Sequence, residues 1–538
     1  MTKPAIEPEL SRDRVAYHES RSEWPVAGAA ALLARRVAST PDRLFVVDGS
    51  RRVTFAEFDG LAAKLARGLR GLGLEPGDVV SWQLPSWLEG AALTVALDAI
   101  GCMSNPILPI YRASEVSFIL RQARSRALVV PGVFRGFDHR ELAREVKPAA
   151  PDLEHVIVTR ADPLAGMEAF ERLLDPAETA ALPQSPFGPH DASSLFYTSG
   201  TTAEPKGVLH TQSSLGAYAR INAAAVGSRE TDVSLLQFPL THIGGIGAFV
   251  LLPILVGSAC VYLDVWDPET AIALIEREKV TTAGGPPAIL QGILAAPGFR
   301  PERFASVRNA ATGAADVPPE LIRRVRRLMG ASSYRSYGMT ECPMFSSGRP
   351  SDPEEKGVET DGRPVPGCRC RIVDDDGHDL PADREGEVLV FGPQLCVGYL
   401  DSRLDAEAFT PQGFFRSGDL GIVDDDGYLT ITGRKKDIII RKGENLSAKA
   451  IEDALHDHPK VAAAAVIGVP DPIRGELVCA CVVLAPGAGE LSLAEIEAFM
   501  KAKGVMAQKI PERLEILSEL PRNPTGKVKK FELRDRFR

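Results

Sequence analysis

Residues 197–207, YTSGTTAEPKG, combine several hydroxyl side chains, two glycines and one lysine in a single short segment. Strand-like sequences flank it, SSLFY before and GVLHT after, so we expect a loop at the tip of a β-hairpin. Hydroxyl groups, backbone N–H groups exposed by glycine and a cationic side chain together suit a triphosphate. A Walker loop opens into a helix after Gly-Lys-Ser/Thr, whereas Lys206 is followed by glycine. For the segment taken alone, a polar surface loop is the alternative.

Two later segments carry groups that suit the same ligand. In YRSYGMTE, residues 334–341, an aromatic ring is able to stack on a purine, and Thr340 and Glu341 bring oxygen atoms for a phosphate and its magnesium. In FRSGDLG, residues 415–421, Asp419 stands among glycines, where one carboxylate accepts hydrogen bonds from both hydroxyls of a ribose. Each segment taken alone is typical of a loop or a turn.

Two more segments complete an ordered set of five motifs. TGRKKDIIIRKGENL, residues 432–446, carries Arg434, and LPRNPTGKVKK, residues 520–530, carries Lys527. The five motifs, in this order, resemble the adenylate-forming superfamily of acyl-CoA synthetases, luciferases and the adenylation domains of peptide synthetases. The resemblance extends from about residue 30 to the C-terminus.

The resemblance implies a phosphate-binding role for the loop at residues 198–207 and a magnesium site formed by Thr198 and Glu341. It implies that TGAA, residues 312–315, lies on the adenine side and that Tyr337 stacks on the base. The residues implied to bind ATP are Thr198, Ser199, Gly200, Thr201, Thr202, Lys206, Gly313, Ala314, Ala315, Ser336, Tyr337, Gly338, Met339, Thr340, Asp419, Arg434 and Lys527.

The resemblance also implies a catalytic set. Lys527 resembles the lysine that bridges the acyl carboxylate and the α-phosphate, where a preorganised ammonium stabilises developing charge. A solvated tail lysine is its alternative, because two more lysines follow closely. His242 lies where the family places an aromatic or histidine gate beside the acyl carboxylate, and a satisfied interior histidine is its alternative. The implied catalytic residues are Lys527, Glu341, His242 and Thr198.

For the second half-reaction, the resemblance implies that the C-terminal domain turns about a hinge at Lys436, so that residues 441–445 replace Lys527 at the site. Gly443 then lets the backbone pass close to a pantetheine arm, and basic neighbours meet the phosphates of coenzyme A. A hairpin with solvated charges is the alternative. The implied CoA-binding residues are Arg441, Lys442, Gly443 and Glu444.

One residue departs from the family pattern. Ala203 stands where members of the family usually have glycine. If the backbone there needs a positive φ, alanine costs about 1 kcal/mol and stiffens the loop. The departure puts the nucleotide affinity in question, not the class of reaction.

Helical patterns alternate with short apolar strands from residue 27 to about 340, which predicts layered α/β architecture with parallel strands. After residue 360, short strands and Gly/Asp turns predict hairpins and a small barrel. We expect an α/β fold with a large N-terminal domain, residues 1–434, made of two layered α/β subdomains plus a small β-barrel. A small mobile α+β C-terminal domain, residues 435–538, follows.

The composition excludes several classes of function. A net charge of −9 over 538 residues argues against a general nucleic-acid or anionic-membrane surface. The eight cysteines include two CxC pairs in strand-like runs, which favours small core residues over zinc ligands. Reduced thiols of this kind indicate a reducing, cytoplasmic compartment. The start of the chain has no apolar signal-peptide region. Residues 243–263 have no charge, yet a Gly-Ser pair divides them into a buried helix and a strand, not a membrane span.

Two VDDDG sequences lack the ligand spacing of a calcium loop and predict Asp-Gly turns instead. The sequence as a whole predicts an ATP-dependent carboxylic acid:CoA ligase that forms an acyl-AMP and uses ATP, Mg²⁺ and coenzyme A. A medium-chain, carbocyclic or aromatic acid is the expected substrate, with the cyclohexanecarboxylate-CoA ligases as the nearest subgroup. The small, apolar segments HIGGIGAF, residues 242–249, and GPPAIL, residues 285–290, are the expected walls of the acyl pocket. A homodimer is compatible with the sequence. Transfer of the acyl group to a carrier protein or to oxygen, and a non-catalytic nucleotide sensor, are the alternatives.

Overall fold

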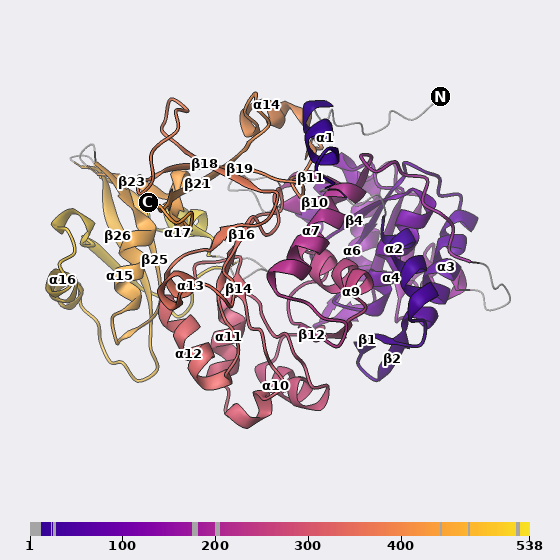
Figure 1. Ribbon diagram of the computed structural model, residues 1–538, viewed down its shortest axis with the longest axis horizontal. Helices are drawn as coiled ribbons and strands as arrows, with labels where there is room; N and C mark the ends of the chain where they lie inside the picture. Colours follow the sequence, from indigo (N-terminus) through magenta and orange to yellow (C-terminus); the bar gives the residue numbers. More distant parts are fainter. Residues whose placement is uncertain are drawn as a thin grey trace.

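The computed structural model describes residues 12–22, 24, 28–174, 181–198, 205–441, 444–471, 474–522 and 528–538. The chain forms mixed α/β layers in its first part and a smaller α+β unit at its C-terminal end, as Figure 1 shows. The predicted fold class is confirmed.

An eight-stranded sheet of order β20-β11-β10-β4-β3-β5-β8-β9 forms the first α/β layer. Its strands from β10 to β9 are parallel, and β11 and β20 are antiparallel additions at one edge. The strands are β3 (Val79–Trp82), β4 (Met103–Pro106), β5 (Ala127–Pro131), β8 (His155–Thr159), β9 (Glu168–Ala169), β10 (Ala192–Thr198), β11 (Lys206–Thr211) and β20 (Gly398–Tyr399).

Helices cover both faces of this sheet because alternate side chains of each strand point to opposite faces. Val129 of β5 shares a core with one group of helices, whereas Leu128 and Val130 share a core with the other. The first group contains α2 (Ala29–Ser39), α3 (Phe55–Gly71), α4 (Leu88–Ile100) and α7 (Gln212–Ala225). The second group contains α5 (Ala113–Gln122) and α6 (His139–Val146).

A second layer is built on the parallel strands β12, β13 and β1, with β2 antiparallel at the edge. Single parallel bridges extend it toward a short sheet of order β14-β15-β16-β17. The strands are β1 (Leu44–Asp48), β2 (Arg51–Thr54), β12 (Val233–Leu236), β13 (Ala259–Tyr262), β14 (Thr312–Gly313), β15 (Arg335–Tyr337), β16 (Ser346–Ser347) and β17 (Arg363–Pro364). The helices that share its core are α10 (Pro268–Arg277), α11 (Pro287–Ala295) and α12 (Pro319–Met329).

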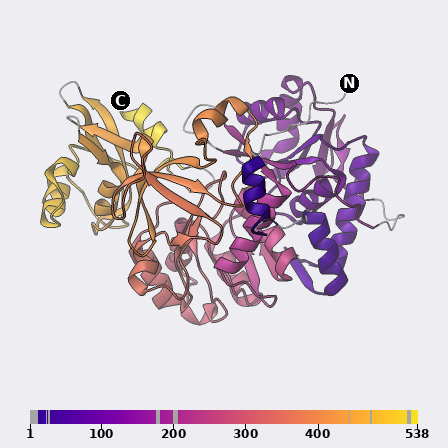
Figure 2. The ribbon, with the colours of Figure 1, turned by 45° about the horizontal axis from the view of Figure 1, so that its top comes forward.

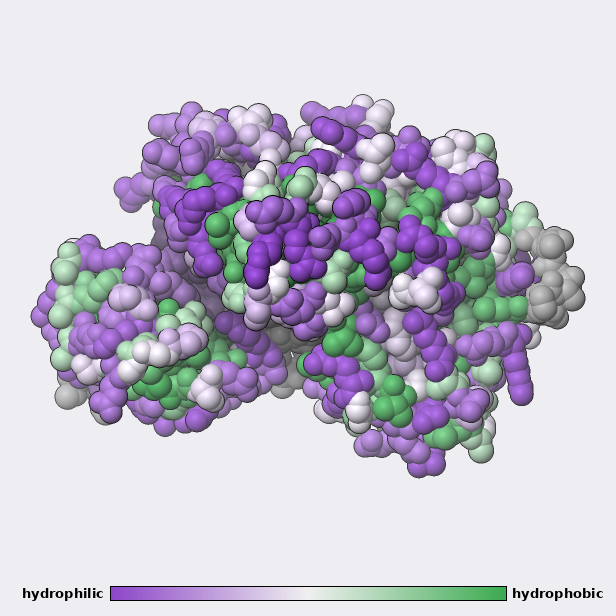
Figure 3. Space-filling view, turned by 90° about the horizontal axis from the view of Figure 1, so that it is seen from below, coloured by the Kyte–Doolittle hydropathy of each residue, from purple (hydrophilic) through white to green (hydrophobic). Residues whose placement is uncertain are grey.

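The uncharged stretch at 243–263 is divided as predicted. It forms α8 (Ile243–Ile246), a π-helical turn (Gly247–Leu251), α9 (Leu252–Val256) and then β13. In the part of the chain that the structure describes, no helix is both long and apolar enough to span a bilayer. Hydrophilic residues cover most of the face seen in Figure 3, with smaller hydrophobic areas between them.

The antiparallel sheet β18-β19-β21-β22 follows, built from the predicted hairpins. Its strands are β18 (Arg369–Val373), β19 (Gly386–Phe391), β21 (Phe415–Val423) and β22 (Leu429–Arg434). Among the described residues, the edge strands β18 and β22 do not pair with each other, so the sheet is open where the sequence predicted a barrel.

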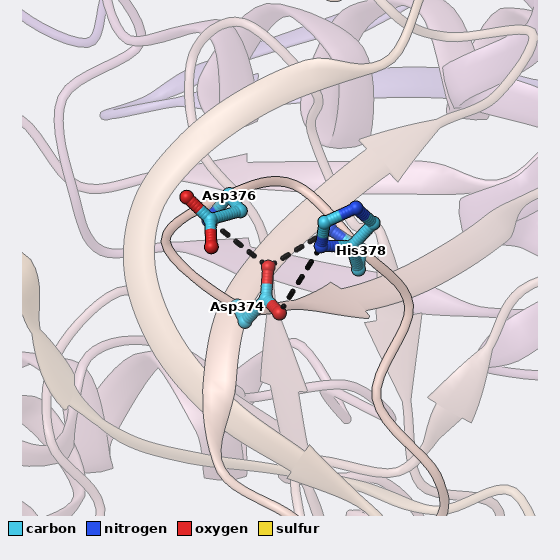
Figure 4. A group of neighbouring side chains, drawn as sticks. All are labelled: Asp374, Asp376 and His378. Carbon is cyan, nitrogen blue, oxygen red and sulfur yellow. Dashed lines mark hydrogen bonds and ion pairs between the residues drawn. The ribbon is translucent and has the colours of Figure 1, made fainter.

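The first VDDDG sequence is a tight turn, as Figure 4 shows. Asp374, Asp376 and His378 bring ligand atoms close together, which suggests a cation site at first sight. However, one carboxylate oxygen of Asp374 already accepts hydrogen bonds from the backbone N–H groups of Asp376, at 3.0 Å, and His378, at 2.9 Å. In the second VDDDG sequence, Asp424 accepts the same two bonds from the backbone N–H groups of Asp426 and Tyr428. The Asp-Gly turn prediction is confirmed, and backbone bonds account for the cluster.

The C-terminal residues form a five-stranded sheet with helices on both faces. Cys479 and Cys481 lie buried together on one face of β26, as the CxC spacing predicts. The elements are β23 (Ile438–Arg441), β24 (Glu444–Ser447), α15 (Ala448–His456), β25 (Val461–Asp471), β26 (Gly475–Leu484), α16 (Leu493–Ala502), β27 (Arg513–Ile516) and α17 (Lys530–Phe537). β22 ends at Arg434, and a helical turn (Lys435–Asp437) leads into β23. The domain boundary after residue 434 stays a prediction.

Candidate active site

Strand pairing brings the predicted adenine-side residues together. Gly313 of β14 lies opposite Ser336 of β15 in parallel register. A Cβ atom on Gly313 would stand 2.2 Å from the Ser336 carbonyl oxygen, so only glycine allows this approach. Ala314 follows with a φ of 64°, a left-handed conformation that is strained for alanine. A Cβ atom on Gly338 would stand 2.4 Å from the Met344 backbone nitrogen, so that turn also needs glycine.

Asp419 is the centre of a buried polar group. Its carboxylate accepts hydrogen bonds from the Tyr337 hydroxyl at 2.7 Å and from Arg434 Nε at 2.5 Å. Asp419 and Arg434 face each other across β21 and β22, so the strand register itself makes the pair. Burial, and then the charge of Asp419, raise the pKa of the Tyr337 hydroxyl well above its usual value, so it stays a donor. The structure thus joins three residues that the sequence named separately.

Glu341 marks the opposite end of the same segment, four residues after Tyr337. Its carboxylate accepts a hydrogen bond from the Tyr399 hydroxyl at 2.7 Å. The ammonium of Lys206 lies 5.2 Å from the centre of the Tyr399 ring, within cation–π range. Thr198 and Lys206 are paired residues at the loop end of the β10–β11 hairpin, which confirms the predicted hairpin. Tyr399 therefore links the phosphate hairpin to the proposed magnesium ligand.

His210 holds Thr340, the residue before Glu341, in place. Its Nε2 atom donates to the Thr340 carbonyl at 2.8 Å, and its Nδ1 atom accepts from the Ser214 hydroxyl at 3.0 Å. Burial lowers the pKa of His210 to about 4, which keeps the ring neutral at neutral pH. Sequence reasoning missed both Tyr399 and His210. The only local signal was a histidine inside an apolar strand, which indicates a satisfied core residue as readily as a functional one.

His242 has a defined structural partner. Its Nδ1 atom accepts a hydrogen bond from the Gly244 backbone N–H at 3.1 Å and caps the N-terminus of α8. Burial lowers the pKa of His242 to about 4, so the imidazole is neutral at neutral pH. This geometry agrees with the alternative of a satisfied interior histidine. The gating role beside the acyl carboxylate stays a prediction.

The two predicted walls of the acyl pocket are joined by one side chain. The amide nitrogen of Gln237 donates to the carbonyl oxygens of Ala283, at 3.1 Å, and Gly284, at 2.9 Å. Gln237 is buried and directly precedes FPLTHIGGI, and the two carbonyls directly precede GPPAIL. The sequence named both walls but not the residue that connects them.

The structure describes only some of the predicted residues of the phosphate loop and of the C-terminal part. Ser199, Gly200, Thr201, Thr202, Ala203, Lys442, Gly443 and Lys527 lie outside the described residues. Arg441 of β23 forms a two-bond ion pair with Glu512, the residue before β27, with Nη2–Oε1 at 2.6 Å. Glu444 is exposed and faces Arg441 across the β23–β24 hairpin. The Lys436 carbonyl accepts from Arg534 Nη2 at 3.3 Å, which ties the predicted hinge to α17.

The layered fold and the grouping of Tyr337, Asp419 and Arg434 agree with a class of enzymes that activates carboxylic acids with ATP. The AMP-binding enzyme family matches residues 33–400, and the C-terminal domain of AMP-binding enzymes matches residues 450–527. The chain belongs to this adenylate-forming family and is an AMP-forming acid ligase.

Curated relatives and solved structures match the chain over nearly its whole length. The chain is 32% identical to the medium-chain fatty-acid–CoA ligase of Escherichia coli K12, over 98% of the chain and 93% of the relative. It is 35% identical to the salicyl-AMP ligase / salicyl-S-ArCP synthetase of Mycobacterium tuberculosis, over 96% and 92%. Among solved structures, the anthranilate CoA ligase AuaEII in complex with anthranoyl-AMP has a TM-score of 0.87 at 27% identity, with 96% and 98% covered.

Proposed function

We propose that the protein is an ATP-dependent carboxylic acid:CoA ligase that forms an acyl-AMP and pyrophosphate, and then acyl-CoA and AMP. The observation that carries the proposal is the segment from Tyr337 to Glu341. One end of it is bonded to the buried Asp419, and the other end presents a carboxylate beside the Thr198–Lys206 hairpin. The residues proposed to bind the nucleoside and those proposed to bind the phosphates therefore lie at the two ends of one segment.

Three residues are proposed to take distinct parts in adenylation. Asp419 has lone pairs beyond those used by Tyr337 and Arg434, so it is able to accept hydrogen bonds from ribose hydroxyls as well. Lys206 adds positive charge where the phosphates would lie. Lys527 is proposed to bring its ammonium to the acyl carboxylate and the α-phosphate, where charge develops as the carboxylate oxygen attacks phosphorus and pyrophosphate leaves.

The donor set near the phosphate end fits a magnesium ion. Glu341 offers a carboxylate whose Oε1 atom is oriented by Tyr399, and Thr198 offers a hydroxyl, both hard oxygen donors. These two residues would hold the ion. When bound, it would neutralise phosphate charge and favour departure of pyrophosphate.

The acid is proposed to be an uncharged medium-chain, carbocyclic or aromatic carboxylic acid. The pocket walls HIGGIGAF and GPPAIL are small and apolar and contain no carboxylate to hold an α-ammonium group. The similar proteins named for fatty-acid, salicyl and anthranilate substrates agree with this class.

A second candidate acceptor is a carrier protein. Its support is the similarity to the salicyl-AMP ligase / salicyl-S-ArCP synthetase at 35% and to the 2,3-dihydroxybenzoate-AMP ligase of Bacillus subtilis at 32% identity. For CoA, the proposed contacts are Arg441, Lys442, Gly443 and Glu444, after rotation of residues 435–538 about Lys436. Because Arg441 pairs with Glu512 in this structure, CoA would have to share or replace that contact.

The test is pyrophosphate release from ATP with a panel of aliphatic, alicyclic and aromatic acids, each with and without CoA. The proposal expects release that depends on the acid, and consumption of one CoA thiol per pyrophosphate. Release without CoA consumption, followed by loading of an added carrier protein, would favour the second acceptor. Absence of ATP–pyrophosphate exchange with every acid would refute the ligase and favour a nucleotide sensor.

A further inference from the structure

The N-terminal helix α1 (Arg12–Glu19) lies outside the region, residues 33–400, that matches the AMP-binding family. Figures 1 and 2 both show this indigo helix beside orange segments from a much later part of the chain. Its contacts reach residues that hold Glu341, and the proposed function gives α1 no role.

Arg14 of α1 makes the central contact. Its Nη1 atom donates to the Cys396 carbonyl at 2.7 Å, and its Nη2 atom donates to the Leu395 carbonyl. Only 7% of Arg14 is exposed. A buried guanidinium that donates to two successive carbonyls orients the backbone strongly, because the bonds are charge-assisted and the planar group fixes their directions.

The peptide unit held by Arg14 also holds Glu341. The Leu395 carbonyl and the Cys396 N–H belong to one peptide group, and that N–H donates to the Glu341 carbonyl at 2.7 Å. Three residues later, the Tyr399 hydroxyl donates to the Glu341 carboxylate. Arg14 therefore contacts one side of a peptide whose other side is bonded to Glu341, and bonds in such a chain strengthen each other.

Aromatic contacts attach the same N-terminal segment at a second point. Trp24 Nε1 donates to the Pro393 carbonyl at 2.7 Å. The His18 ring stacks on Phe391, with centres 5.1 Å apart and planes at 18°. Residues 391–396 are thus contacted along their length by the N-terminal segment.

We propose that Arg14 is a positioning residue for Glu341. By holding the 395–396 peptide, α1 keeps the Glu341 backbone and carboxylate in the orientation needed at the phosphate end of the site. The inference rests on the proposed function, since it gives Glu341 its role toward the metal and the phosphates.

The test compares Arg14→Met with Arg36→Met. Arg36 is a matched control because it also donates to two successive carbonyls, Ile254 at 3.0 Å and Leu255 at 2.7 Å, away from this segment. Hydrogen–deuterium exchange of peptides that contain Cys396 should rise about tenfold in Arg14→Met, the change expected for loss of one hydrogen bond. It should not change in Arg36→Met.

The second readout is the Mg²⁺ concentration that gives half-maximal ATP–pyrophosphate exchange. It should rise several-fold in Arg14→Met, return part of the way in Arg14→Lys, and stay unchanged in Arg36→Met. Equal behaviour of the Met variants in both measurements would overturn the inference, as would faster amide exchange with unaltered Mg²⁺ dependence. If the wild-type protein shows no exchange with any acid, the proposed function fails, and Mn²⁺ binding with a non-hydrolysable ATP analogue then replaces this readout, with the same expectations.

Discussion

The proposed nucleotide face, at Tyr337, Asp419 and Arg434, and the proposed CoA-binding face of the C-terminal part, at Arg441, are built in different ways. On the nucleotide face, Tyr337, Asp419 and Arg434 are joined by side-chain hydrogen bonds that strand register enforces. On the C-terminal face, Arg441 pairs with Glu512, which directly precedes β27 of the same C-terminal unit. The first face is therefore organised before any ligand binds, whereas the second is proposed to act only after its domain has turned. Rigid strands suit binding, and hairpins on a hinged domain suit two successive tasks.

The sharpest test of this difference separates the two half-reactions. Lys527→Ala should lower adenylation about a hundredfold or more, because the developing charge loses its ammonium. Thioester formation from supplied acyl-AMP should change little. Gly443→Phe should show the reverse pattern, since a bulky side chain blocks the proposed pantetheine path. Pyrophosphate exchange and acyl-CoA formation measure the two steps.

Lys529→Ala is the matched control, because Lys529 adjoins the same segment and pairs with Glu532 at 2.7 Å. It should leave both half-reactions near the wild-type rates. If Lys527→Ala and Gly443→Phe each impair both steps equally, the assignment of one step to each face is wrong.

The nucleotide face should respond to loss of its central charge. Asp419→Asn should raise the KM for ATP at least about tenfold, because the ribose clasp and the partner of Arg434 are weakened together. It should also destabilise the fold by roughly 2 kcal/mol. This is less than the cost of breaking a fully buried ion pair, since the Arg434 side chain is 34% exposed. Steady-state kinetics and urea denaturation measure these effects.

Tyr337→Phe tests the same group of side chains with a smaller change, because it removes only the hydroxyl that donates to Asp419. It should cost about 1 kcal/mol of stability and raise the KM for ATP only a few-fold. A larger effect on kinetics than that of Asp419→Asn would argue against Asp419 as the centre of this face.

Acid should destabilise the folded protein through two buried neutral histidines, His210 and His242. Burial lowers the pKa of His210 and of His242 to about 4, below the value near 6.5 of an unfolded chain. Between these values the unfolded state binds more protons, so stability falls as the pH drops, by up to about 1.4 kcal/mol per pH unit for each histidine. His210→Gln should remove part of this slope between pH 7 and pH 5.

Gln retains a nitrogen able to donate to the Thr340 carbonyl, so the variant isolates the titration from the hydrogen bond. Replacement of His378, whose side chain is 78% exposed, is the control. Urea denaturation at several pH values measures the slopes, and identical slopes for wild type and His210→Gln would contradict the expectation.

The smallest expected effect concerns strain at the adenine side. Ala314→Gly should stabilise the protein by up to about 1 kcal/mol, because glycine adopts the φ of 64° without steric cost. Ala315→Gly, one residue later, should give no such gain. Melting temperatures measured by calorimetry compare the two, and destabilisation by Ala314→Gly would show that the alanine methyl group is needed there.

The residue pattern was sufficient to predict the layered α/β fold, the β10–β11 hairpin, the Asp-Gly turns and the burial of Cys479 and Cys481 on one strand face. Each of these has a local signal, such as alternation of apolar residues, glycine at a turn, or β-strands on both sides of a loop. The barrel was predicted from the same hairpins, but closure depends on pairing between distant edge strands, and β18 and β22 do not pair among the described residues.

By itself, the sequence determined which groups are proposed to take part in the chemistry, because an ordered set of hydroxyl, glycine, carboxylate and cationic motifs can be read along the chain. Only the tertiary structure showed what holds these groups: Tyr399 on Glu341, His210 on the Thr340 carbonyl, and Arg14 on the 395–396 peptide. These partners lie 58, 130 and 382 residues apart along the chain. Contacts over such separations leave no periodic or local pattern, since packing of complete elements, not neighbouring residues, brings their atoms together.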